Sequence, residues 1–277
     1  MIDFTAEQNA RTYSGRRAHP SWAEHVRALV DPRGADVVDI GCGGGIYSRA
    51  WRDLGADSVI GVDASAPILT SAGEDHRDDP RISFQQGDAL ATGLPDASAD
   101  VVFARALVHH LQDLQAFTRE ARRLLRPGGT LIIQDRTLDD VSQPPDVDLP
   151  GGARHLRGWF FQEFPSLLEV EAARRPEAVA LRQALQNSGA QVETSTVWEV
   201  RAEHADREAL IADLAARTGR SILHELDDAE LARLVSVVRD NLPPGPVIET
   251  DRWTLWAARI PAADSQQLDP HASAGHE

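Results

Sequence analysis

The sequence contains no lysine, and all 28 of its lysine-or-arginine residues are arginine. This absence excludes enzymes that form a Schiff base on lysine, anchor pyridoxal phosphate to lysine, or bind nucleotides through a P-loop lysine. Cys42 is the single cysteine. One thiol can build neither an internal disulfide nor a thiolate metal cluster, so we expect no metal site, and trivalent arsenic is not an expected substrate.

Long apolar runs and an excess of basic charge are also missing. No segment approaches the roughly 18 apolar residues of a membrane-spanning helix, and the first residues lack the basic and apolar regions of a signal peptide. The formal net charge is −15, and phosphate backbones require clustered cations, so a nucleic-acid partner is not expected. We expect a cytoplasmic monomer or homodimer with no nucleic-acid or membrane partner.

Two short apolar segments, each ending in an aspartate, flank a run of glycines. Residues 37–40 indicate a buried parallel strand, and the alternate glycines within residues 41–45 allow a sharp turn close to a ligand before a helix over 46–54. Residues 59–63 predict the next strand. Its last residue, Asp63, can accept hydrogen bonds from both hydroxyls of a ribose. The arrangement predicts a nucleoside pocket.

The spacing of the glycines separates two families of nucleotide-binding proteins. The dinucleotide fingerprint G-x-G-x-x-G is broken by Ile46 when it is read from Gly41, and is imperfect at Ser48 when it is read from Gly43. Neither frame explains Asp39. With Asp39 included, the run reads D-x-G-x-G-x-G and resembles the class I S-adenosylmethionine-dependent methyltransferases, in which this motif cradles the methionine part of the cofactor.

Further motifs extend the resemblance along about a hundred residues. The run Gln-Gly-Asp-Ala at 86–89 closes a strand over 82–86, at the point where the family places an acid on the adenine amino group. A fourth strand is predicted over 100–104. The sequence R-x-L-x-P-G-G at 123–129 ends a helix over 113–124, and is frequent in small-molecule methyltransferases before a strand such as 130–134.

The resemblance implies a Rossmann-like, doubly wound, seven-stranded α/β sheet, mostly parallel, with its last strand antiparallel. Strands over 191–200 and 252–259 would complete it. Outside the core we expect a loop over 139–152 and helices over 159–172, 175–188, 206–217 and 227–240. The predicted organisation is one domain over 1–261, with an N-terminal lid (1–30), a cofactor-binding core (31–135), two helical cap insertions (136–190 and 201–245) and a disordered tail (262–277).

The implied cofactor is S-adenosylmethionine, and the implied product is S-adenosylhomocysteine. Tyr13 and Arg17 are spaced to share a helical turn in the lid and are expected to close on the cofactor carboxylate, although a solvated basic face fits them equally. Cys42 is expected as a small residue in a tightly packed loop rather than as a nucleophile. The full predicted cofactor set is Tyr13, Arg17, Asp39, Gly41, Cys42, Gly43, Gly45, Asp63, Ala64, Gly87, Asp88, Ala89 and Arg105.

Acceptor chemistry is expected beyond the fourth strand and in the cap. His109 and His110 follow that strand and are candidates for a base that takes a proton from the acceptor, while a purely local role at the start of a helix is the alternative. Arginines beside aromatic residues suit an anionic acceptor, but in an acidic chain they also suit ion pairs. The predicted substrate residues are Arg136, Arg154, Trp159, His224 and, most strongly, Arg220.

Three functions are consistent with these patterns. The first is methyl transfer from S-adenosylmethionine to a small-molecule acceptor, which the motifs favour. A non-catalytic module that binds the same cofactor is the second. An NAD-linked oxidoreductase is the third, because Asp63 and the glycines also occur in NAD-binding folds.

Overall fold

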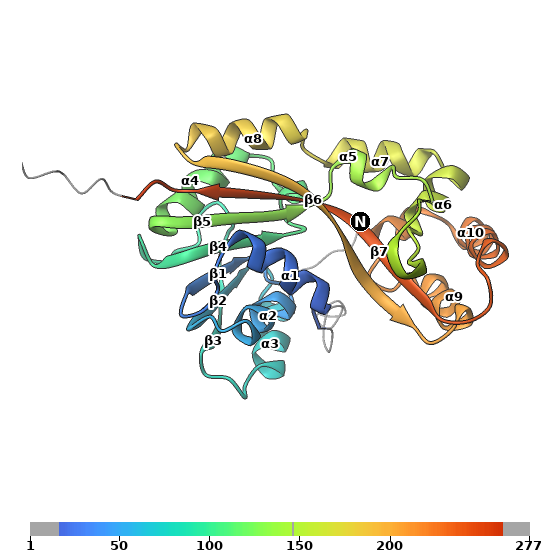
Figure 1. Ribbon diagram of the computed structural model, residues 1–277, viewed down its shortest axis with the longest axis horizontal. Coiled ribbons are helices and arrows are strands. Elements are labelled where there is room, and N and C mark those ends of the chain that lie inside the picture. The colour runs from blue at the N-terminus through green and yellow to red at the C-terminus, as the bar shows by residue number, and fades with distance from the viewer. Residues whose placement is uncertain (1–16, 146, 263–277) are drawn as a thin grey trace, which may run out of the picture.

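The computed structural model describes residues 17–145 and 147–262, and its centre is a seven-stranded sheet with the order β3-β2-β1-β4-β5-β7-β6 (Figure 1). Strand β7 pairs antiparallel with both of its neighbours, whereas the pairs among β1 to β5 are parallel. The predicted mostly parallel sheet with an antiparallel last strand is therefore confirmed. The strands are β1 Asp36–Ile40, β2 Ser58–Asp63, β3 Ile82–Gln86, β4 Ala99–Arg105, β5 Leu125–Asp135, β6 Gln191–His204 and β7 Val247–Arg259.

Helices cover both faces of the sheet. Helices α1 (Pro20–Leu29) and α2 (Ile46–Asp53) bury Trp22 and Trp51 on one face, against Phe103 of β4. Helix α3 (Ala66–Asp75) lies beside α2 over β2 and β3 (Figure 1). Helices α4 (Leu114–Leu124) and α8 (Ala178–Asn187) pack on the opposite face. Apolar strands covered on both faces are typical of parallel sheets.

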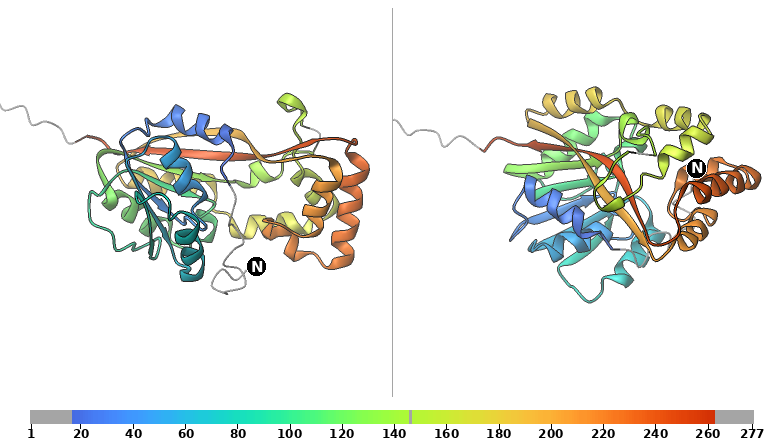
Figure 2. Two further views of the ribbon diagram at one scale, coloured as in Figure 1. Left: turned by 90° about the horizontal axis from the view of Figure 1, so that it is seen from below. Right: turned by 45° about the vertical axis from the view of Figure 1, so that its right-hand side comes forward.

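A second group of helices forms the cap at the far ends of β6 and β7. Both strands run out of the core and into the cap, which Figure 2 shows from two further directions. The cap has its own apolar core, to which α6, α7, α9 and α10 contribute. Its helices are α5 Leu138–Val141, α6 Arg157–Glu163, α7 Ser166–Arg174, α9 Arg207–Ala215 and α10 Asp228–Asn241, with short 3-10 helices η3 Pro150–Gly152 and η4 Ser221–Glu225.

Several element predictions need correction. The helix expected over 159–172 is divided into α6 and α7, because Pro165 lies between them and cannot donate a backbone hydrogen bond. The loop expected over 139–152 contains α5 and η3. Helices α1 and α3 were not predicted. Helix α8 falls inside the predicted first cap insertion but packs on the core sheet against α4. None of the helices in the described part of the chain combines the length and apolar character needed to span a bilayer.

Buried ion pairs connect the cap to β7. Glu249 of β7 bonds both Arg220, which follows α9, and Arg201 of β6. The Arg220 side chain is 1% exposed, and its Nη1 also lies 2.7 Å from Asp213 of α9. All three guanidinium nitrogens of Arg220 therefore have protein partners. The expectation that Arg220 contacts the substrate does not fit this position, because its donors are already used.

We predict that Arg220 is a stability residue. Arg220→Met should lower the free energy of unfolding by about 3–5 kcal/mol, because it leaves a buried carboxylate without its main partner. Urea unfolding followed by circular dichroism measures this. Arg33→Met is the matched control, since the Arg33–Asp31 pair is exposed (80% and 59%) and should contribute little to the free energy of unfolding. A loss for Arg220→Met no larger than that of the control would contradict the assignment.

Candidate active site

The carboxyl ends of β1, β2, β3 and β4 meet at one edge of the sheet, and the predicted glycine loop follows β1 there. Gly41, Gly43 and Gly45 have φ values of 73°, 50° and 76°, in the left-handed region that favours glycine. A Cβ at Gly45 would lie 2.7 Å from the Phe84 ring, and one at Gly41 would lie 2.9 Å from Leu107. Neither of these two positions has room for a side chain, and the loop leads directly into α2.

Asp63 fastens this loop to the end of β2. One carboxylate oxygen accepts a hydrogen bond from the Gly43 amide at 3.0 Å, and the other accepts one from the Ser65 amide at 2.9 Å. A carboxylate has about four lone-pair positions, so each oxygen keeps capacity for a further donor. Paired hydroxyls are suitable donors. Ala64, the next residue, is exposed.

Asp39 lies beneath the loop rather than on its surface. Its side chain is buried and accepts a 2.7 Å hydrogen bond from Ser48 of α2. Burial raises the pKa of Asp39 to about 7; the bond from Ser48 opposes this, and the nearby Asp63 adds to it. The hydrogen bond between Asp39 and Ser48 therefore joins β1 to α2, the two elements that the glycine loop connects.

The remaining predicted cofactor residues of β3 and the loop are also at this edge. Asp88 is exposed and accepts a hydrogen bond from the Leu90 amide at 2.8 Å, which holds its carboxylate at the end of β3. Gly87 is confined, since a Cβ there would lie 2.9 Å from the Thr92 carbonyl oxygen, and Ala89 is partly buried against the core. The Cys42 thiol is buried, and burial raises its pKa well above the ordinary value, which disfavours a nucleophilic thiolate.

Arg105, at the end of β4, lies between two aromatic rings. Its guanidinium carbon is 4.3 Å from the Tyr47 ring centroid and 3.9 Å from that of Trp253. Its Nη2 donates to Glu199 at 2.7 Å, and Glu199 also accepts a 2.6 Å hydrogen bond from Gln134. The sequence did not identify Glu199 or Trp253, because β6 and β7 are distant from the motifs along the chain.

The structure gives the two histidines different environments. His109 Nδ1 lies 2.9 Å from a carboxylate oxygen of Asp135, at the end of β5, and that carboxylate also accepts from Arg175. A carboxylate on Nδ1 favours the tautomer whose other nitrogen, Nε2, accepts a proton. His110 is exposed and its ring centroid is 4.1 Å from that of His109. Desolvation of its ring and the neighbouring His109 lower the pKa of His110 to about 4.

The predicted substrate residues do not form one group. Arg136 follows β5 directly, beside Asp135, and bonds Asp251 at 3.0 Å. Trp159 packs against the cap core, and Arg154 donates to its neighbouring carbonyl, that of Ala153. His224 is exposed on η4, within the cap. Of this set, Arg136 alone is adjacent to the His109–Asp135 pair along the chain.

The two predicted lid residues differ in what can be described. Tyr13 lies outside the described residues. Arg17 is exposed and precedes α1.

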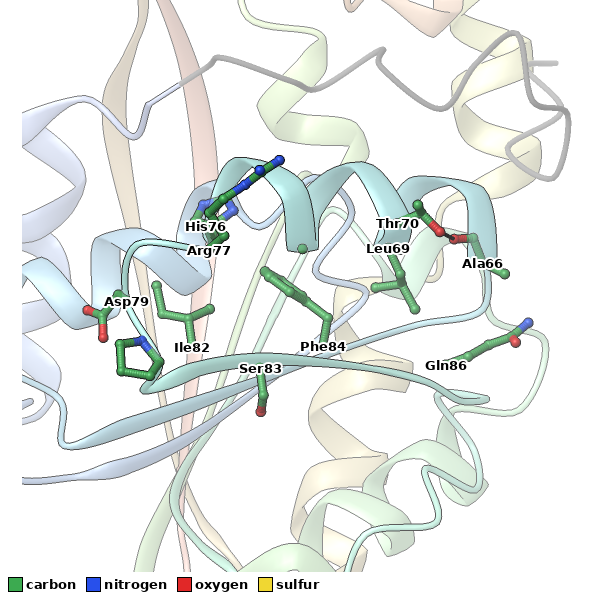
Figure 3. A pocket seen from close by; sticks show the side chains of 12 residues that line it. Ala66, Leu69, Thr70, His76, Arg77, Asp79, Ile82, Ser83, Phe84 and Gln86 are labelled. Atoms are coloured by element: carbon green, nitrogen blue, oxygen red, sulfur yellow. Dashed lines mark hydrogen bonds between the residues drawn. The ribbon is translucent and has the colours of Figure 1, made fainter.

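A cavity of about 490 Å³ lies away from these residues, between α3 and the edge strand β3 (Figure 3). Leu69, Ile82 and Phe84 form its apolar part, and His76 and Arg77 lie on its α3 side. It contains none of the predicted cofactor or substrate residues. Two residues that line the cavity, Phe84 and His76, also pack against Gly45 of the glycine loop.

The buried position of Asp39 predicts a pH dependence of stability. Its folded pKa of about 7 lies above the unfolded value of 3.8, so its contribution to stability is present in full below about pH 4 and is lost as the pH rises through 7. Asp39→Asn keeps an acceptor for Ser48 without the charge. The variant should therefore gain about 1–4 kcal/mol relative to the parent between pH 5 and pH 8, measured by urea unfolding. A difference that does not change with pH would contradict the assignment.

Comparison with known proteins agrees with this geometry. A family model described as a methyltransferase domain matches residues 38–133. A probable S-adenosylmethionine-dependent methyltransferase of Mycolicibacterium smegmatis is 33% identical over 137 residues, which cover 50% of this chain and 51% of the relative. The chain thus spans about half the length of the curated relatives it matches.

Two solved structures show the same fold at low sequence identity. One is a methyltransferase assigned to an antibiotic biosynthesis pathway of Anabaena variabilis (TM-score 0.62, 19% identity, covering 85% of this chain and 96% of that one). The other is a phosphoethanolamine N-methyltransferase of Haemonchus contortus, in complex with phosphomonomethylethanolamine and S-adenosylhomocysteine (TM-score 0.56, 18% identity, covering 94% and 61%). The family model identifies a methyltransferase domain over residues 38–133, and the glycine loop, Asp63 and the sheet order of this chain resemble those of the class I S-adenosylmethionine-dependent methyltransferases.

Proposed function

We propose that this protein transfers the methyl group of S-adenosylmethionine to a small-molecule acceptor, which can be anionic. The observation that carries the proposal is the joint between Asp63 and the glycine loop. Asp63 holds the Gly43 amide at 3.0 Å and keeps acceptor capacity for a ribose diol. Because Gly41 and Gly45 have no side chains, the loop can turn sharply at the end of β1 and still pack against Leu107 and Phe84. These features fit the adenosine and methionine parts of the cofactor.

The cofactor supplies an activated methyl group, and the protein supplies position and proton transfer. Asp63 would hold the ribose, the loop would hold the methionine part, and Asp88 would lie beside the adenine. His109 would take the proton of an acceptor hydroxyl or amine on Nε2, while Asp135 holds Nδ1 and stabilises the imidazolium that results. His109 and then Arg175, which both contact Asp135, lower the pKa of that carboxyl despite its burial and so favour its ionised form.

We propose that the methyl acceptor is a small molecule. We also propose that the protein acts as a monomer or homodimer. Relatives named for small-molecule acceptors support the first of these proposals, among them 2-methyl-6-phytyl-1,4-hydroquinone methyltransferase of Synechocystis sp.. The chain's negative charge supports an acceptor other than a nucleic acid.

The cofactor assignment predicts the effect of removing the Asp63 carboxylate. Asp63→Ala should weaken S-adenosylhomocysteine binding at least tenfold, since each charge-assisted hydrogen bond contributes about 1.5–3 kcal/mol. Isothermal calorimetry measures the affinity. Asp57→Ala, just before the same strand and 68% exposed, is the control and should bind like the parent. Unchanged binding by Asp63→Ala, or competition by NAD but not by S-adenosylhomocysteine, would refute the assignment.

The proposed base predicts a kinetic effect without a binding effect. His109→Gln should leave S-adenosylhomocysteine affinity unchanged and lower kcat by about 10²–10⁴-fold, the range typical of general-base catalysis. His110→Gln is the control and should cost less. For a hydroxyl acceptor the loss should shrink as the pH rises, because the acceptor then ionises without help. Product formation can be followed by mass spectrometry over a panel of phenols, amines and acids. Equal rates for His109→Gln and the parent would remove His109 from the mechanism.

A further inference from the structure

The Asp251 carboxylate, on β7, lies among three guanidinium groups. Arg157 Nε is 2.9 Å from one oxygen, Arg136 Nη1 is 3.0 Å from the other, and Arg201 Nη1 is 3.9 Å from that second oxygen. The side chain of Asp251 is 3% exposed. One negative charge thus faces three positive ones in a place that water reaches poorly, where electrostatic interactions are strong.

The wider set of charges around Asp251 also has an excess of positive charge. We call it the junction cluster, because it lies where the sheet meets the cap. Its groups are connected through ion pairs and, at Arg105, through the Trp253 ring. Its guanidinium groups are those of Arg105, Arg136, Arg157, Arg175, Arg201 and Arg220. Its carboxylates are those of Asp135, Glu171, Glu199, Glu249 and Asp251.

These groups are six cations and five anions, which leaves one positive charge in excess. Arg174 and Asp213, at the edges of the cluster, add one charge of each sign and leave the balance unchanged. Burying an uncompensated charge is costly, so buried charges in proteins are normally paired. One further negative charge would therefore neutralise the junction cluster.

Two unpartnered hydrogen-bond donors also lie in the junction cluster. The Nε groups of Arg136 and Arg105 are buried and have no partner within the described part of the chain. Both guanidinium groups lie against the Trp253 ring, with their central carbons 4.4 Å and 3.9 Å from its centroid. A buried donor without a partner is costly, and an anionic acceptor would satisfy it. Burial and the nearby Arg157 also lower the pKa of Arg136, despite the attraction of Asp251, consistent with a positive local potential.

The position of Arg136 relates this feature to the reaction. Arg136 follows β5 directly, and its amide donates to Asp135 at 2.8 Å, the carboxylate that holds His109. Arg105 ends the neighbouring strand β4. The two arginines therefore stand at the ends of neighbouring strands, and Arg136 is next in the chain to the carboxylate that bonds the proposed base.

We propose that Arg136, with Arg105 on the same indole ring, binds one carboxylate group of the acceptor, so that the preferred acceptor is a monoanionic carboxylic acid. This proposal rests on the proposed methyl transfer. A carboxylate is favoured over a phosphate monoester because it carries one charge, whereas the phosphate carries about −1.5 to −2 near pH 7 and would overcompensate the cluster. The planar guanidinium also suits a planar carboxylate.

The test uses the full chain saturated with S-adenosylhomocysteine and measures ligand binding by calorimetry. Benzoate is the probe, benzamide is its neutral counterpart, phenyl phosphate is the dianionic comparison, and chloride keeps the ionic strength constant. Benzoate should bind at least tenfold more tightly than either comparison compound. Arg136→Met should weaken benzoate binding at least tenfold. Arg252→Met, on the same strand as Asp251 but paired with Asp139, should not weaken it.

A second variant guards against a simple loss of folding. Arg136→Lys keeps the positive charge, and S-adenosylhomocysteine binding reports that the core is intact. The lysine variant should still weaken benzoate binding, because it lacks the planar fork. Benzoate binding that is unchanged in both Arg136 variants, or that does not exceed benzamide binding in the parent, would overturn the proposal.

The cofactor has a carboxylate of its own, and a separate comparison distinguishes the two sources. S-adenosylhomocysteine and its decarboxylated analogue should lose no affinity in Arg136→Met if the anion belongs to the acceptor. A loss for S-adenosylhomocysteine but not for the analogue would assign Arg136 to the cofactor and overturn the proposal. Absence of S-adenosylhomocysteine binding in the parent would instead refute the proposed function, so the two failures are distinguishable.

Discussion

Two buried carboxylates on β7, Glu249 and Asp251, hold the cap and the sheet together. Their arginine partners come from β6, from α6, and from the segments that follow β5 and α9. Arginine pairs on Glu249 lower its pKa to about 2 despite burial, and Arg157, Arg136 and Arg201 lower that of Asp251 further, so both carboxylates are ionised at neutral pH. The position of the cap relative to the edge of the sheet therefore depends on charge pairing as well as on the apolar core of the cap.

The same strand connects the cap to the candidate active site. Trp253, two residues after Asp251, contacts the guanidinium groups of both Arg105, at the end of β4, and Arg136, which follows β5. Glu199 on the paired strand β6 joins Arg105 to Gln134. Residues that anchor the cap thus also fix the side chains on the β4 and β5 side of the sheet edge. A chain that uses arginine as its only strong base is suited to this, because guanidinium groups can stack on aromatic rings and pair with carboxylates at once.

The core and its glycine loop could be predicted because their signals are local. The glycine spacing, Asp39, Asp63 and the Pro-Gly-Gly turn each lie within a few residues of the strand they end or begin. The junction cluster could not be predicted, since Arg105 and Glu199 are 94 positions apart, and Arg157 and Asp251 likewise. Arg220 is an example of a residue whose partner is distant in the sequence. Its neighbours in sequence favour a ligand contact, whereas its position is explained by Glu249, which lies 29 positions further along the chain.

A structure of the protein crystallised with S-adenosylhomocysteine tests the central claim most directly. The account predicts both ribose hydroxyls within hydrogen-bonding distance of the Asp63 carboxylate, with the methionine part against the glycine loop of residues 41–45. S-adenosylhomocysteine bound elsewhere, for example in the cavity between α3 and β3, with Asp63 making no contact to it, would contradict the account.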